Sequence, residues 1–250
     1  MHHTVAWSAN ASNTAEVDLT PVADPVIPVT AANHFLPQRD QPILYIGAAS
    51  PNLQRARITT PTLALVTTPF VQPINQAATF GIPQRFADYS AQPLMLRALE
   101  EISLLVTQTG GAAEFVTGVA GLLYQFIPPP QGTVWTLRAT SVTAAVARVW
   151  TQLTLTFQNQ LPSGSFAVVG LTHQSTNAMA SRLIFENQVP RPGSLSIQSL
   201  TNFNDRLFDG SSPETLGVWG QFHNYIMPLC EVLCNAADAA HEVYLDIMRV

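Results

Sequence analysis

The sequence contains 250 residues, of which 47% are hydrophobic and only 11% are charged, and its formal net charge is −5. A chain of this length accommodates one large β domain or two smaller ones, each able to bury a core without metal or disulfide support. All of the basic residues are Arg and none of them cluster, which argues against a nucleic-acid-binding face, and no apolar run is long enough to span a membrane.

The first 38 residues contain neither Lys nor Arg. The chain therefore starts without the basic and apolar regions of a secretory signal and without a basic arm that could hold nucleic acid. We expect an extended N-terminal arm, with His2 and His3 in a disordered tail.

Frequent Pro and Gly residues divide the chain into runs of about four to nine residues, the length of strands. Several runs alternate with period two, as when Thr151, Leu153 and Phe157 share one face. We therefore predict an all-β fold of antiparallel strands. The candidates are Ile43–Gly47, Arg55–Thr60, Leu63–Thr68, Val134–Ala139, Val149–Phe157, Phe166–Leu171, Ser181–Glu186, Leu195–Leu200, Gly217–Phe222, Glu231–Asn235 and Val243–Val250.

Short motifs recur in the same order in the two halves of the sequence. Their offsets lie between 123 and 130 positions, and they pair Asn33 with Asn159, Pro37 with Pro162, Gly47 with Gly170, Arg57 with Arg182, Glu101 with Glu231, and Ala113–Val116 with His241–Tyr244. We infer an internal duplication with a first β unit at 1–127, a stiff Pro-rich linker at 128–131 and a second β unit at 132–250.

One segment gives conflicting signals. Pro93–Val106 has helical spacing of apolar residues and Pro in its first turn. Its counterpart in the repeat, Leu216–Cys234, contains Gly and Pro at positions that favour strands. Because tertiary context often overrides helix propensity, we follow the repeat and predict a strand over Glu101–Thr107.

The low share of charged residues points to covered surfaces. In soluble domains about a quarter of all residues are usually charged. A monomer with far fewer charged residues would expose large uncharged patches. We expect neighbouring molecules to cover much of the surface, and a monomer coated with neutral polar residues is the alternative. Arg suits interfaces because its planar group forms bidentate pairs, although compositional bias in the source genome would also exclude Lys.

No motif for catalysis, a cofactor or a metal is present. The sequence lacks a nucleophile elbow, a phosphate-binding loop and a dinucleotide fingerprint. We expect Cys230 and Cys234 to be buried thiols, too far apart in one strand to form a disulfide, with a zinc site that includes distant His residues as the alternative. The sequence therefore predicts no enzymatic activity, no cofactor and no metal.

Two carboxylate pairs, Glu100–Glu101 and Asp238 with Glu242, could serve as an acid and a base. Carboxylates this sparse are more typical of loops and strand edges, and we interpret both pairs in that way.

One segment, Trp219–Tyr225, is a candidate for binding. It places aromatic residues beside Gln221 and Asn224, a mixture typical of carbohydrate-binding faces, while core or interface packing is the alternative explanation. The possible ligand or interface contacts are Trp219, Phe222, His223 and Tyr225.

Two β units of similar length, joined by a Pro spacer and poor in charge, resemble the jelly-roll proteins of virus particles. In the double-jelly-roll major capsid proteins, two barrels stand side by side and three chains form a pseudo-hexagonal block. The resemblance implies that the repeated Pro, Gly, Arg and Glu positions are framework residues of two tandem jelly-roll-like barrels or sandwiches.

The resemblance also implies a non-enzymatic function. We expect a coat protein or a phage-head decoration (cement) protein that forms homotrimers, assembles in the host cytoplasm and resides in the virion. Its partners would be copies of itself and other particle components, without sequence-specific binding of nucleic acid and without a membrane span. The alternative is a tandem β-sandwich module that binds a carbohydrate or a receptor, for example on a phage tail.

Overall fold

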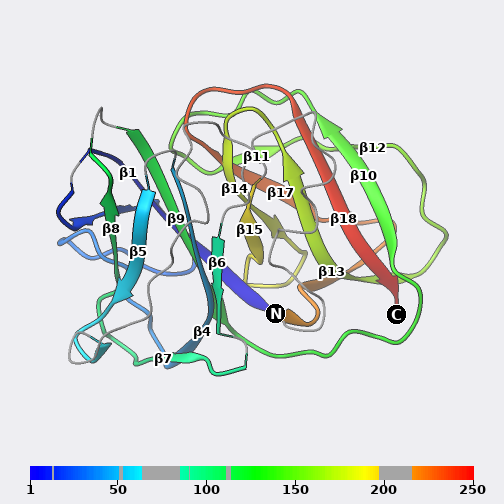
Figure 1. Ribbon diagram of the computed structural model, residues 1–250. Coiled ribbons are helices and arrows are strands. Elements are labelled where there is room, and N and C mark those ends of the chain that lie inside the picture. Colours follow the sequence, from blue (N-terminus) through cyan, green and yellow to red (C-terminus); the bar gives the residue numbers. More distant parts are fainter. Residues whose placement is uncertain (13, 51–52, 64–84, 90, 111–113, 197–215) are drawn as a thin grey trace. The chain divides into compact units, whose positions relative to one another are not determined.

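A computed structural model describes residues 1–12, 14–50, 53–63, 85–89, 91–110, 114–196 and 216–250. The chain divides into two compact units, a first unit of Val5–Leu122 and a second unit of Met1–Thr4 with Leu123–Val250. The described part of the chain is all-β, as the sequence predicts, and its strands pair in antiparallel sheets (Figure 1).

The first unit contains two sheets. Their strand orders are β3-β1-β9-β4-β6, with β7 also paired to β4, and β2-β8-β5. The strands are β1 (His2–Ala11), β2 (Val17–Asp18), β3 (Thr20–Pro21), β4 (Gln41–Ala49), β5 (Leu53–Thr59), β6 (Arg85–Asp88), β7 (Leu94–Leu96), β8 (Ser103–Gln108) and β9 (Glu114–Leu123). Alternate residues of these strands bury their side chains in one apolar cluster, in which the ring of Trp7 meets that of Phe35 edge to face at 5.0 Å.

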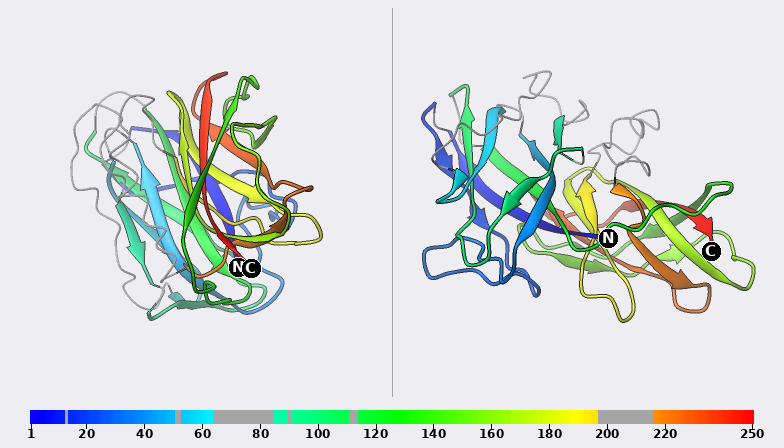
Figure 2. Two further views of the ribbon diagram at one scale, coloured as in Figure 1. Left: turned by 90° about the vertical axis from the view of Figure 1, so that its right-hand side faces the viewer. Right: turned by 90° about the horizontal axis from the view of Figure 1, so that it is seen from below.

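The second unit also contains two sheets, ordered β12-β10-β18-β13-β16 and β11-β17-β14-β15. The last strand, β18, lies between β10 and β13 (Figures 1 and 2). The strands are β10 (Trp135–Ser141), β11 (Thr151–Leu153), β12 (Thr156–Phe157), β13 (Ser165–Gln174), β14 (Ala178–Ile184), β15 (Gly193–Leu195), β16 (Gly220–His223), β17 (Leu229–Cys234) and β18 (His241–Arg249).

The two units share one pairing scheme. The strands β1, β2, β4, β5, β7, β8 and β9 pair among themselves in the same order as β10, β11, β13, β14, β16, β17 and β18. Register irregularities also recur at matching places: one between Leu53 and Arg55 and one between Ala178 and Ala180. A second matching pair lies in β4 and in β13. The two units therefore share the places of these bulges as well as the order of strand pairing.

The pairings also correct two of the sequence anchors. Arg57 lies opposite Leu105, whereas Arg182 lies opposite Glu231. The counterpart of Glu231 is therefore Leu105 and not Glu101. In the same way, the bulges align Tyr45 with Gly170, so Gly47 is not the counterpart of that glycine. Register is common to the two units at these positions, but residue identity is not.

The predicted strands are recovered with some differences. The conflicting segment forms β8 over Ser103–Gln108, which confirms the strand. Val149–Phe157 was expected to be one strand, but it forms β11 and β12, which belong to different sheets. Leu63–Thr68 and Leu195–Leu200 lie mostly outside the described residues.

The unit boundary differs from the predicted 1–127 and 132–250. It falls between Leu122 and Leu123, ahead of the Pro-rich segment at 128–131. The residues just after the boundary are bound to the second unit by backbone hydrogen bonds. The amides of Tyr124 and Gln125 donate to the carbonyl of Met1, and the amide of Val218 donates to the carbonyl of Ile127.

The expectation of a disordered tail at His2 and His3 is wrong, because both side chains are buried. The Nε2 atom of His2 lies 3.2 Å from the carbonyl oxygen of Gly193, and its ring meets that of Trp219 edge to face at 4.8 Å. His3 accepts a hydrogen bond from the amide of Arg191 through Nδ1 at 2.9 Å. These contacts hold the start of the chain within the second unit.

A buried ion pair connects the same segment to the sheet. Arg182 on β14 donates through Nε to Glu231 on β17 at 2.7 Å and through Nη1 to the carbonyl of Thr4 at 3.2 Å. The guanidinium of Arg182 also lies over the ring of Trp150, 4.2 Å from its centroid. Arg191 adds a second cation to Glu231 at 2.8 Å. Since the pair is buried, its partners depend on each other for charge compensation.

We expect Arg182→Ala to lower the free energy of unfolding by about 3 kcal/mol, because it removes the buried donor of the Thr4 carbonyl and leaves Glu231 with Arg191 as its cation. The matched control is Arg57→Ala at the corresponding position of the first unit, where the partner Glu16 is partly exposed. That substitution should cost less than about 1 kcal/mol. Urea unfolding of both variants measures the difference, and equal costs would contradict the assigned role of the buried pair.

Two buried imidazoles stack in the second unit. The ring centroids of His173 on β13 and His241 on β18 are 5.4 Å apart. Burial lowers the pKa of His173 from 6.5 to about 3, and burial also lowers the pKa of His241, partly offset by the charge of Asp238. The carboxylate of Asp238 accepts its hydrogen bonds from Ser175 and from the amides of Asn177 and Ala240. The pair is therefore neutral in the folded chain near neutral pH.

Because these folded-state pKa values lie below the unfolded value of 6.5, the unfolded chain binds protons first as the pH falls. The stability that the pair contributes is present above about pH 6.5 and is lost progressively below it. We expect the melting temperature to fall between about pH 7 and pH 5, and His173→Gln with His241→Gln to reduce that fall. Identical slopes in the unmodified protein and in the doubly substituted variant would refute the assignment.

Candidate functional site

The segment Trp219–Tyr225 forms β16 and the loop that follows it, and this division separates the four predicted contacts. Trp219 is 0% exposed, and Phe222 is buried with its ring stacked on Phe166 at 5.7 Å. His223 is half-buried, and Tyr225 is 76% exposed. Trp219 therefore belongs to the core, while His223 and Tyr225 remain on the surface.

The pairing of β16 with β13 explains this division. Phe222 lies opposite Phe166, and the next residue, His223, lies opposite Ser165 with its side chain toward the other face. Gly220 is required by close packing, because a Cβ atom there would lie 2.4 Å from the ring of Phe185. The strand ends at His223, after which the chain turns and the amide of Ile226 donates to the His223 carbonyl at 2.8 Å.

Three loops of the second unit lie together beyond this turn, and we call them the loop end: 158–164, 185–192 and 224–228. Asn224 and Gly164 exchange two hydrogen bonds, from the amide of Asn224 to the Gly164 carbonyl and from the amide of Gly164 to Oδ1 of Asn224, each at 3.1 Å. Gln188 donates through Nε2 to the carbonyl of Gln221 at 3.0 Å. The loop end is therefore cross-linked by polar contacts.

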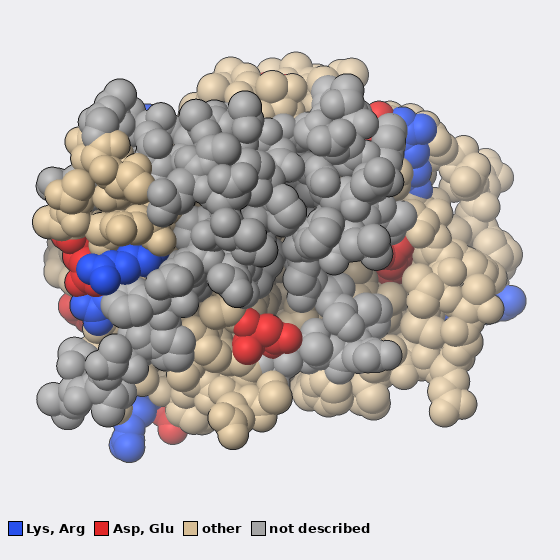
Figure 3. Space-filling view, in the orientation of Figure 1, with Lys and Arg blue, Asp and Glu red and all other residues tan. Residues whose placement is uncertain are grey.

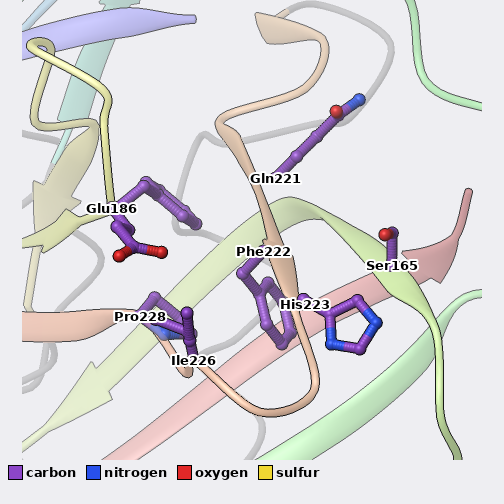
Figure 4. A pocket seen from close by; sticks show the side chains of 8 residues that line it. Ser165, Glu186, Gln221, Phe222, His223, Ile226 and Pro228 are labelled. Atoms are coloured by element: carbon purple, nitrogen blue, oxygen red, sulfur yellow. The ribbon is translucent and has the colours of Figure 1, made fainter.

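A smaller pocket of about 210 Å³ opens at the loop end (Figure 4), lined by Ser165, Phe185, Glu186, Gln221, Phe222, His223, Ile226 and Pro228. It contains the residue types of a Ser-His-Glu hydrolase. However, Glu186 and His223 lie on opposite sides of the Phe222 ring (Figure 4). Among the described hydrogen bonds none joins Ser165 to His223, so the arrangement that activates a serine nucleophile is not formed.

A larger pocket of about 400 Å³ lies on the other side of the same loop, lined by Phe157, Asn159, Gln160, Leu161, Asn224, Tyr225 and Met227. Its lining combines aromatic rings, amides and apolar side chains without a charged residue. Tyr225 was predicted from the sequence, but the residues at 157–161 were not. They comprise the end of β12 and the loop after it, and they come near Tyr225 only through long-range strand pairing.

The cysteines behave as expected of buried thiols. Cys230 and Cys234 are both buried and unbridged, and burial raises the pKa of each thiol. A thiol held in the neutral form is a poor nucleophile and a poor metal ligand. Within the described ranges, no cluster of three or more His, Cys, Asp or Glu side chains is arranged to hold a metal ion.

The carboxylates of the two candidate acid–base pairs are bound to separate partners. Glu101 accepts a hydrogen bond from His34 at 2.9 Å, and the other ring nitrogen of His34 contacts Asp18 at 2.9 Å. These two carboxylates raise the pKa of His34. Glu242 binds Arg138 at 2.7 Å and Tyr244 at 2.5 Å. The contacts of His34 join three segments of the first unit, and the Arg138–Glu242 ion pair joins the neighbouring strands β10 and β18.

A comparison with models of protein families, with curated proteins and with solved structures found no match. In the described part of the chain, no helix has the length and apolar character needed to cross a membrane.

The burial of Trp219 predicts opposite effects for the two ends of the candidate segment. Trp219→Ala should destabilise the protein by about 3–5 kcal/mol, because it removes a fully buried ring that contacts His2. Tyr225→Ala should change the free energy of unfolding by no more than about 0.5 kcal/mol. Denaturant unfolding compares the two variants, and a neutral Trp219→Ala would show that the ring is not part of the core.

Proposed function

We propose that this chain is a non-enzymatic structural protein of a virus or phage particle, built from two tandem jelly rolls. The strand order of the second unit carries the proposal. When β12 is set aside and the other strands are numbered from one to eight, the two sheets are ordered 1-8-3-6 and 2-7-4-5. That is the strand order of the jelly roll, a fold frequent in capsid proteins.

The first unit supports the same interpretation over its described strands. Its sheets contain β1-β9-β4-β7 and β2-β8-β5, which match the order of the second unit. Among the described strands of the first unit, none pairs with β5 as β15 pairs with β14. The two proposed jelly rolls in one chain match the domain composition of the double-jelly-roll capsid proteins, the family that the sequence resembles.

The fold alone does not separate a shell protein from a lectin, since both use jelly rolls. The surface favours a shell protein. Charged residues make up only 11% of the sequence, and in Figure 3 a few blue and red groups interrupt the otherwise tan surface on the right of the view. Several Arg residues bind carboxylates of the same chain, among them Arg57, Arg138 and Arg182. These cations are already paired, which leaves them less suited to binding phosphates.

Exposed apolar side chains supply a surface for self-association. In the loop between β10 and β11, Val142 is 88% exposed and Val146 is 59% exposed, with Val149 nearby in the chain. Exposed apolar side chains grouped in one loop are typical of an interaction site. Modest contacts of this kind suffice in a symmetric shell, because symmetry repeats each contact many times. The proposed unit is a homotrimer that associates with other copies and other particle components.

Electron microscopy and mass photometry of the purified protein test this function. We expect a species of three times the 27.1 kDa of one chain, and ordered shells, tubes or sheets at high concentration. Val142→Asp with Val146→Asp should weaken association, because a charge in an apolar contact is desolvated without a partner. The same two positions changed to Ser serve as the uncharged control. A strict monomer at high concentration, with no assembly after salt addition or crowding, would refute the proposal.

A further inference from the structure

The larger pocket of the loop end is lined by aromatic rings and amides and by no charged residue. None of the structural roles described above accounts for this lining. Phe157 and Tyr225 supply ring faces, and Asn159, Gln160 and Asn224 supply amides. We propose that this pocket binds an uncharged sugar residue. The inference is independent of the shell function, because binding by a single chain requires no assembly.

The chemistry of the lining selects the class of ligand. A charged ligand would lose water on entry and would need a partner of opposite charge. No Arg, Asp or Glu lines the pocket. Arg249, which lies beside the loop, donates instead to the carbonyl of Ser163 at 3.4 Å. A neutral ligand therefore fits this pocket better than an anion or a cation.

The polar groups match a ligand rich in hydroxyls. Asn224 uses its Oδ1 atom to hold Gly164, which leaves its Nδ2 group to donate elsewhere. Asn159 and Gln160 are exposed, and each amide can both donate and accept. A hydroxyl group also donates and accepts, so amides can satisfy it in either sense. A few polar groups placed around an apolar lining are what fix the orientation of a small ligand.

The aromatic rings match the apolar face of a sugar ring. Tyr225 is 76% exposed, and its ring lies 4.9 Å from that of His223 at an angle of 30°. Tyr presents an apolar face together with a polar hydroxyl, which suits a partner that has both kinds of surface. Phe157 is held from the other side by the pairing of β12 with β10, where it lies opposite Ala139.

The pocket is also formed before any ligand arrives. Its walls are joined by the two hydrogen bonds between Asn224 and Gly164 and by the turn from His223 to Ile226. A preformed site loses less conformational freedom on binding, which raises affinity. Its volume of about 400 Å³ lies within the range of small-molecule sites, about 300–1,000 Å³.

Saturation-transfer NMR with the full chain tests the proposal. The probes are the methyl glycosides of glucose, galactose, mannose and N-acetylglucosamine, with sialyllactose as a charged comparison. We expect transfer to at least one neutral glycoside and weaker transfer to sialyllactose. Tyr225→Ala should weaken binding about tenfold, because it removes the stacking face while the fold is retained. Asn159→Ala and Gln160→Ala should each weaken it by a smaller factor.

Val189→Ala is the matched control, since Val189 is exposed on the neighbouring loop and does not line the pocket. It should bind the sugar as the unmodified protein does. The proposal fails if no neutral glycoside receives more saturation transfer from the unmodified protein than from the Tyr225→Ala variant. It also fails if sialyllactose binds more tightly than every neutral glycoside. It also fails if Tyr225→Ala abolishes self-association while no sugar binds, which would make the pocket an interface between copies. A monomer that binds a neutral glycoside would refute the shell function and leave this inference standing.

Discussion

Both units depend on a central strand that comes from their own C-terminal end. β9 lies between β1 and β4, and β18 lies between β10 and β13. In the two sheets, β1 is joined to β4 only through β9, and β10 is joined to β13 only through β18. Both pairings of the last strand join residues that lie far apart in the sequence, such as Trp135 with Ile247. Folding that relies on such distant pairs is slow compared with folding through local contacts.

The fold class was predictable from the sequence because strand periodicity and the spacing of Pro and Gly are local signals. The repeat was also predictable. However, the alignment of the two halves by matching residues was wrong at positions where the strand register pairs residues of different type. Arg182 faces Glu231, and the corresponding Arg57 faces Leu105 and binds Glu16 instead. A search for matching residues therefore paired the two Glu residues wrongly. The division of Val149–Phe157 between two sheets could not be predicted either. Apolar and polar residues alternate through the whole segment, so the pattern does not change where the partner strand changes.

The candidate site was predictable only in part. Trp219 and Tyr225 are close in sequence and looked equivalent, but burial by His2 and Phe185 separates the core end of the segment from its exposed end. The residues that complete the larger pocket, from Phe157 to Leu161, carry no aromatic cluster or motif that marks them. They belong to the site because β12 and β16 are both fixed to the same sheet, a fact of tertiary pairing that composition does not reveal.

The placement of His2–Thr4 has a consequence for biosynthesis. His2 is translated long before its partners Gly193 and Trp219, which follow it by 191 and 217 positions in the sequence. At about 5–20 residues per second, the interval is on the order of ten seconds or more. Throughout that interval the segment lacks these two partners. The second unit can therefore be completed only after Gly193 and Trp219 have been translated, by a segment that was translated much earlier.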